Sequence, residues 1–150
     1  MAQATHQIRV EADPVQYDRM FDRETGLPRW PLLLDRSSIA LARAHRVNRV
    51  VAAFVLDDPR TFDGDLPDFQ EVARRLVARI RPDDTVARVA RRTFVVVCND
   101  IRRDQDAAGV AQRLLHNSGV VARLGVALGV PGDTPETLLA RALDQAAINF

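Results

Sequence analysis

The run from Arg81 to Val97 constrains the fold of this chain more than any other stretch, because two β-rich segments meet in it across a tight connection. Along the first arm, residues 85, 87 and 89 alternate with residues 86, 88 and 90, as the two faces of a strand do. Residues 94–97 of the second arm form a continuous β-branched and aromatic run that is typical of a buried central strand. Arg91 and Arg92 fall at the tip. Since the tip lacks the Asn-Gly or Asp-Gly pair that is usual for a two-residue hairpin, the sequence leaves the turn type open.

The segments around this hairpin alternate between strand and helix patterns. Residues 49–56 form a buried first strand that ends at Asp57-Asp58-Pro59, and apolar spacing predicts helices over residues 68–80 and 107–115. Residues 120–128 predict a further strand, and a last helix follows from 134 to about 146. From residue 50 to 128 the order is the ferredoxin-like βαββαβ order, which predicts an α+β sandwich with a mainly antiparallel sheet.

Two helices are predicted ahead of this core. Asp13 is a favourable N-cap and Pro14 a favourable first helical residue, and the breakers Gly26 and Pro28 end this helix. A second helix begins at about residue 30, with Ile39 among its apolar positions. Residues 1–12 are polar and aperiodic, which predicts a flexible lead-in and a single domain over residues 13–150.

Composition limits the classes of function. A chain of 150 residues with 47% hydrophobic and 27% charged residues is typical of one soluble globular domain. A net charge of +1 argues against nucleic-acid and membrane partners, and the sequence contains no apolar run long enough to span a bilayer, so we expect a cytoplasmic protein. The single Cys98 forms no internal disulfide, and the three histidines lack metal-ligand spacing, so no metal or cofactor is predicted.

The hairpin resembles that of diguanylate cyclase (GGDEF) domains. The family carries Arg-x-x-Asp-x-Val-Ala-Arg-x-Gly-Gly-Asp/Glu-Glu-Phe, and this chain matches the frame from Arg81 to Val89 and again at Phe94. The stretches 22–28 and 34–36 are similar to the family's Asp-x-Leu-Thr-Gly-Leu-Pro and Leu-Asp-Arg, and two later matches extend the resemblance to about residue 147. It implies the same βαββαβ core with two leading helices and one trailing helix.

The family's signature is replaced, so the chain is identified as a degenerate GGDEF domain. Ala90 and Arg91 stand where the family has two glycines, and Arg92 and Thr93 stand where it has two acids. Those acids hold Mg²⁺ and the glycines let the backbone approach GTP, so the resemblance implies no catalytic residues here and no cyclase activity. One carboxylate at residue 57 or 58 would hold a metal poorly, and these two are better explained as turn aspartates.

Further losses point the same way. The family's stretch after the first strand is shortened here to residues 60–67, the asparagine of its guanine pocket has no counterpart, and its aspartate is at best Asp65, out of register. The family's C-terminal lysine, which meets phosphate, is also absent.

A second site of the family is retained in the sequence. Its Arg-x-x-Asp pair forms an inhibitory site for the product, cyclic di-GMP, and Arg81 and Asp84 keep that spacing, while Arg113 matches a further arginine of the site. Guanidinium groups suit phosphates and the guanine O6/N7 edge, and a carboxylate accepts from guanine N1 and N2. The alternative is structural, because basic and acidic residues are common where a helix ends and a strand begins.

Two functions follow from this pattern. The first is a catalytically inactive receptor that binds cyclic di-GMP through Arg81, Asp84 and Arg113 and dimerises on binding. The second is a protein-interaction module without a ligand, which pairs with itself or with another signalling protein. The sequence leaves both open.

Overall fold

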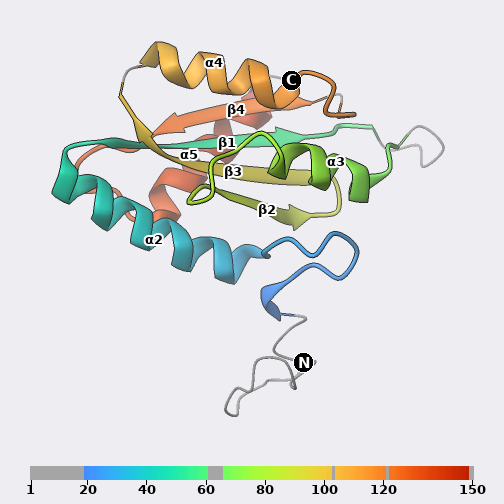
Figure 1. The fold of residues 1–150 in the computed structure, drawn as a ribbon, viewed down its shortest axis with the longest axis horizontal. Helices are drawn as coiled ribbons and strands as arrows, with labels where there is room; N and C mark the ends of the chain where they lie inside the picture. The colour runs from blue at the N-terminus through green and yellow to red at the C-terminus, as the bar shows by residue number, and fades with distance from the viewer. Residues whose placement is uncertain (1–18, 61–65, 103, 121, 149–150) are drawn as a thin grey trace.

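The computed structural model describes residues 19–60, 66–102, 104–120 and 122–148. Its elements are α2 (Trp30–Val47), β1 (Val50–Asp57), α3 (Phe69–Val77), β2 (Thr85–Ala90), β3 (Thr93–Ile101), α4 (Asp104–Leu115), β4 (Arg123–Leu128) and α5 (Pro135–Ile148). From β1 to β4 this is the strand, helix, strand, strand, helix, strand order that the sequence predicts. The predicted α+β class is confirmed (Figure 1).

The four strands form one sheet in the order β2-β3-β1-β4, and the three pairings are antiparallel. β1 is central, so Phe54 lies opposite Val96 of β3 on one side and Val126 of β4 on the other. This position explains why β1 is a continuous apolar run, since a strand with a neighbour on each edge and helices on both faces has no face in contact with water.

Helices cover both faces of the sheet, and each face has its own apolar core (Figure 1). α3 and α4 pack on the face that carries Phe54, Phe94 and Val96. α2 and α5 pack on the opposite face, against Val55 and Val95. Because successive residues of a strand point to opposite faces, the unbroken run of β3 supplies both cores at once.

The hairpin forms as predicted, with Arg91 and Arg92 as a two-residue connection between Ala90 and Thr93. Neither arginine has a positive φ, so the turn is neither of the two mirror-image types that usually close such hairpins. The pairing shifts between Arg88 and Ala90, which leaves Val89 as a bulge. A bulge bends its strand and increases the local twist.

Several element boundaries differ from the sequence prediction. α3 ends at Val77 rather than near residue 80, and β4 begins at Arg123 rather than residue 120. Ile39 is 63% exposed and so does not belong to the buried stripe of α2. The lead-in and the start of the first predicted helix lie outside the described residues. Of that predicted helix, residues 19 and 20 are described as helical. Within the described residues no helix has the length and apolar character to cross a bilayer.

Candidate functional site

Arg88 of β2 holds the tip of the hairpin. Its guanidinium is buried and donates to Asp22 Oδ2 at 3.1 Å and to Glu24 Oε1 at 2.7 Å. It also donates from Nε and Nη2 to the carbonyl oxygen of Arg91 at 3.0 and 2.6 Å, and lies 4.7 Å from the centre of the Phe69 ring. One side chain therefore ties the loop before α2 to the tip of the hairpin.

The loop before α2 is ordered around Asp22. Its Oδ2 accepts from the backbone N–H of Thr25 at 2.9 Å and from the Thr25 hydroxyl at 2.7 Å, and Gly26 follows with a φ of 75°. Burial by itself would raise the pKa of Asp22, but the hydrogen bonds from Thr25 and Arg88 outweigh it and hold the pKa below the usual value. The carboxylate is therefore charged and opposite Arg88 at neutral pH.

The carboxylates beside the hairpin tip are held by arginines and a hydroxyl. Asp58 is 2% exposed and accepts from Arg60 Nε at 2.9 and 3.1 Å and from Arg60 Nη2 at 2.5 Å. Asp57 accepts from the Thr93 hydroxyl at 2.6 Å, and Arg123 Nε lies 3.9 Å from its other oxygen. No group of three or more metal-ligating side chains occurs in the described part of the chain. The turn-aspartate interpretation fits Asp58, which accepts from the backbone N–H of Arg60 at 3.0 Å, but Asp57 is the last residue of β1 and pairs with Thr93 and Arg123 in the sheet.

Asp84 orders the start of β2, as the structural alternative predicts. Its Oδ2 accepts from the backbone N–H of Arg81 at 3.1 Å, and its Oδ1 accepts from the backbone N–H of Asn99 at 2.9 Å. The N–H of Asp84 in turn donates to the Arg81 carbonyl at 3.0 Å. A carboxylate offers about four lone-pair directions, so these two bonds fix its position and leave acceptor capacity on both oxygens.

The fold brings Arg81 and Arg113 to one surface hollow of about 730 Å³. Arg113 extends from the end of α4, where its Nε donates to the carbonyl of Arg79 at 3.4 Å. The remaining lining residues come from the end of α2 and the connection after it, from the end of β3 and the residue after it, and from α4. They are Arg43, Val47, Arg49, Asp100, Ile101, Arg102, Asp106, Gly109 and Val110.

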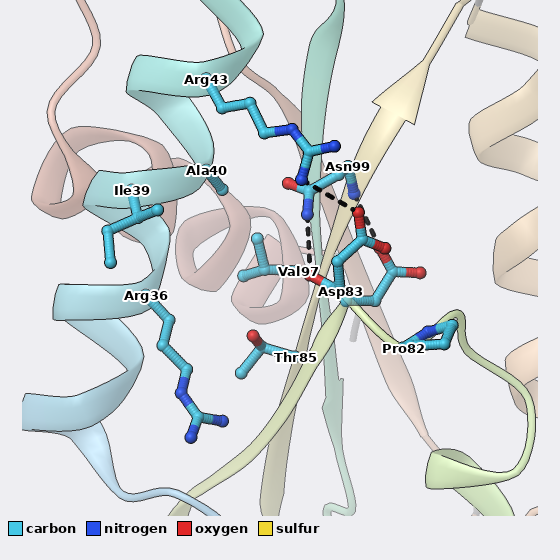
Figure 2. Close-up of a pocket in the computed structure, with 10 residues that line it drawn as sticks. Arg36, Ile39, Ala40, Arg43, Pro82, Asp83, Thr85, Val97 and Asn99 are labelled. Carbon is cyan, nitrogen blue, oxygen red and sulfur yellow. Dashed lines mark hydrogen bonds and ion pairs between the residues drawn. The ribbon is translucent and has the colours of Figure 1, made fainter.

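Asp84 lines an adjoining hollow of about 360 Å³, which shares Arg43 with the first (Figure 2). Figure 2 shows Arg43 extending from α2 towards Asp83, whose carboxylate it meets at 3.4 Å. Asn99 lies beside them and donates from its side-chain amide to the Asp83 carbonyl at 2.8 Å. The three residues predicted from the Arg-x-x-Asp pattern therefore surround one region, although no single hollow contains them all.

Cys98 is a buried thiol near Asp84. Burial raises the pKa of its thiol to about 12, and the neighbouring Asp84 carboxylate also raises it, whereas Arg113 and Arg81 lower it. At neutral pH Cys98 is a protonated core residue, as the sequence predicts.

No family model matches the chain. A curated relative, the bifunctional diguanylate cyclase/cyclic di-GMP phosphodiesterase MucR of Pseudomonas aeruginosa, is 31% identical over 153 residues, which cover 87% of this chain and 21% of MucR. The crystal structure of the GGDEF domain of YfiN (TpbB) from P. aeruginosa matches 83% of this chain and 90% of that one, with 26% identity and a TM-score of 0.69. This chain is a GGDEF-like domain. It spans about a fifth of the length of MucR.

A third match has too little sequence identity to show more than the fold. The GGDEF domain of DgcB from Caulobacter crescentus, crystallised in complex with c-di-GMP, matches 98% of this chain and 92% of that one. The TM-score is 0.74 and the identity 17%. This match confirms the fold, and the family rests on the similarity to MucR and to the YfiN domain.

Sequence reasoning missed two groups of residues. Arg88 could have been found, because a charged residue inside an apolar strand needs a buried partner. Arg43, Arg49 and Arg102 carry no local signal, because they come from a helix, the residue before a strand and the residue after another strand. Only the tertiary fold brings them beside Arg81.

Proposed function

We propose that this GGDEF-like domain is a catalytically inactive receptor for cyclic di-GMP. The ligand binds over the hollow that Arg81 and Arg113 line, next to the carboxylate of Asp84. The guanidinium groups take a phosphate and the O6/N7 edge of guanine, and Asp84 accepts from guanine N1 and N2.

One observation carries the proposal: Arg81 and Arg113, far apart in the sequence, line the same hollow. Neither guanidinium has a carboxylate partner among the described residues, so both can receive an anion without first breaking an ion pair. Asp84 is held rigidly by two backbone donors, and a fixed acceptor lowers the entropy lost on binding. The crystallised complex of the DgcB domain with c-di-GMP adds support from a protein of the same fold.

Inactivity rests on the hairpin and its surroundings. Arg92 and Thr93 stand where the family has two acids. The hydroxyl of Thr93 donates to Asp57, so this position offers no carboxylate to a metal. Asp58 is occupied by Arg60. A Mg²⁺ ion requires several oxygen ligands in near-octahedral geometry, and the described residues offer no such set.

Isothermal titration calorimetry with cyclic di-GMP tests the receptor. Arg81→Ala is expected to weaken binding by about 10- to 30-fold, or roughly 1.5–2 kcal/mol, because it removes a charge-assisted contact that is exposed to solvent. Arg74→Ala is the matched control, since Arg74 is an exposed arginine on α3 that pairs with Glu71 and does not line the hollow. Absence of heat for the wild type at high micromolar ligand, on folded protein, would refute the receptor.

A turnover assay tests inactivity separately. Incubation of the pure domain with labelled GTP and Mg²⁺ is expected to yield no cyclic di-GMP above a protein-free blank, because the metal ligands are missing. A GGDEF domain with its signature intact, run in parallel, controls for the assay. Product that disappears in an Asp57→Ala, Asp58→Ala double variant would show that these carboxylates support catalysis after all.

The second candidate is a protein-interaction module that pairs with itself or with another signalling protein. It is favoured by two exposed apolar side chains on α2, Ile39 at 63% and Val47 at 50%. The two functions separate by experiment. Light scattering with and without cyclic di-GMP is expected to show association that depends on ligand if the receptor is correct, and association without ligand if the module is.

A further inference from the structure

Two further arginines, Arg49 and Arg102, line the hollow that Arg81 and Arg113 line. Arg49 stands between α2 and β1, and Arg102 directly follows β3. Neither residue belongs to the Arg-x-x-Asp pattern. Both are exposed and line the hollow, so both can reach a ligand without any change in packing.

Charge in the hollow is unbalanced. Its lining includes the five arginines 43, 49, 81, 102 and 113, but only the two aspartates 100 and 106. Arg43 meets Asp83 at 3.4 Å, and Arg113 donates to a backbone carbonyl. Within the described residues, the guanidinium groups of Arg49, Arg81 and Arg102 have no ion-pair or hydrogen-bond partner. Several unpaired cations in one concave surface raise the local concentration of anions.

A cyclic dinucleotide carries two phosphates on opposite sides of its ring. If one phosphate and one guanine are held by Arg81, Asp84 and Arg113, the other phosphate needs separate cations. The planar fork of an arginine holds a phosphate through parallel hydrogen bonds. Because Arg81 and Arg113 are engaged by the first phosphate and its guanine, the phosphate on the far side of the ring must be held by other guanidinium groups. Arg49 and Arg102 are the unpaired cations on the same hollow that the first contact leaves unused.

We propose that Arg49 and Arg102 bind the second phosphate of the dinucleotide and thereby make the site selective for ligands with two separated phosphates over mononucleotides. This inference rests on the proposed receptor function and assigns two further residues to the same site. Because both side chains are exposed, their attraction to phosphate is screened by salt, with a Debye length of about 8 Å at physiological ionic strength. Binding of the dinucleotide should therefore weaken as salt is added.

The test compares cyclic di-GMP with GMP by calorimetry at two salt concentrations. The Arg49→Ala, Arg102→Ala double variant is expected to bind cyclic di-GMP about 30-fold more weakly than the wild type, and with a smaller dependence on salt. Its affinity for GMP should change by less than about twofold, because GMP needs only the contacts of Arg81, Asp84 and Arg113. Arg46→Ala is the matched control, since Arg46 is an exposed arginine in the last turn of α2 that does not line the hollow.

The outcomes separate this inference from the proposed function. If the wild type binds cyclic di-GMP and the double variant binds it as tightly as Arg46→Ala does, the receptor stands and the second phosphate site is refuted. Equal weakening for cyclic di-GMP and GMP would also refute it, because the two arginines would then act through the general charge of the surface. If the wild type binds no cyclic di-GMP, both proposals fail together.

Discussion

Gly125→Ala is expected to lower the free energy of unfolding by about 3 kcal/mol or more, the effect of forcing atoms into a filled core. A Cβ at this position of β4 would lie 2.0 Å from the carbonyl oxygen of Ala142 and 2.6 Å from the backbone nitrogen of Ala146. Both atoms belong to the backbone of α5, so no side-chain rotation can relieve the overlap. The helix would have to move away from the sheet.

Chemical denaturation followed by circular dichroism measures this change. Gly109→Ala is the matched control, because nothing lies within 4 Å of a Cβ at that position in α4. There the substitution is expected to raise the stability by about 0.5–1 kcal/mol, the difference in helix propensity between alanine and glycine. A loss of under about 1 kcal/mol for Gly125→Ala would mean that α5 does not pack on β4 as closely as described.

Arg88→Ala is expected to lower the free energy of unfolding by about 3 kcal/mol, since it breaks a largely buried charge network by removing one partner. The Arg88 side chain is 4% exposed, whereas Asp22 is 23% and Glu24 52% exposed. Water can therefore partly solvate the two carboxylates that are left. This keeps the expected loss of stability at the lower end of the range for breaking a buried ion pair. The loss also includes the cation–π contact with Phe69.

Two further variants isolate the cause. Arg88→Lys keeps the charge but loses the fork that reaches Asp22, Glu24 and the Arg91 carbonyl together, so it should recover part of the loss. Arg74→Ala breaks an exposed pair with Glu71 and should change stability by less than about 0.5 kcal/mol. If Arg88→Ala were as mild as Arg74→Ala, the network would be a surface feature with no part in holding the hairpin.

The Arg88 network explains how the hairpin keeps its shape. The turn contains no glycine, and its tip carbonyl is held by a side chain from the same strand. Through Arg88, Asp22 and Glu24 of the loop before α2 are connected to the carbonyl of Arg91 at the tip.

The sequence by itself determined the order and type of the elements, because these depend on local patterns. The apolar run of β3, the alternation in β2 and the stripe of α3 each follow from the periods of strands and helices. The burial of Cys98 and the position of the hairpin tip were predicted in the same way. Element ends were less accurate: α3 ends early at Val77, since no local signal separates the last turns of a helix from the loop after it.

Only the tertiary structure decided which charged side chains share a site. The pairing of Arg88 with Asp22, and the gathering of Arg49 and Arg102 beside Arg81, join segments that are remote in the chain. The exposure of Ile39 was also decided there, because its helical spacing fits a buried stripe while the position of α2 on the sheet leaves it in water. Local periodicity fixes the direction of a side chain relative to its own element, whereas its neighbours depend on how the elements pack.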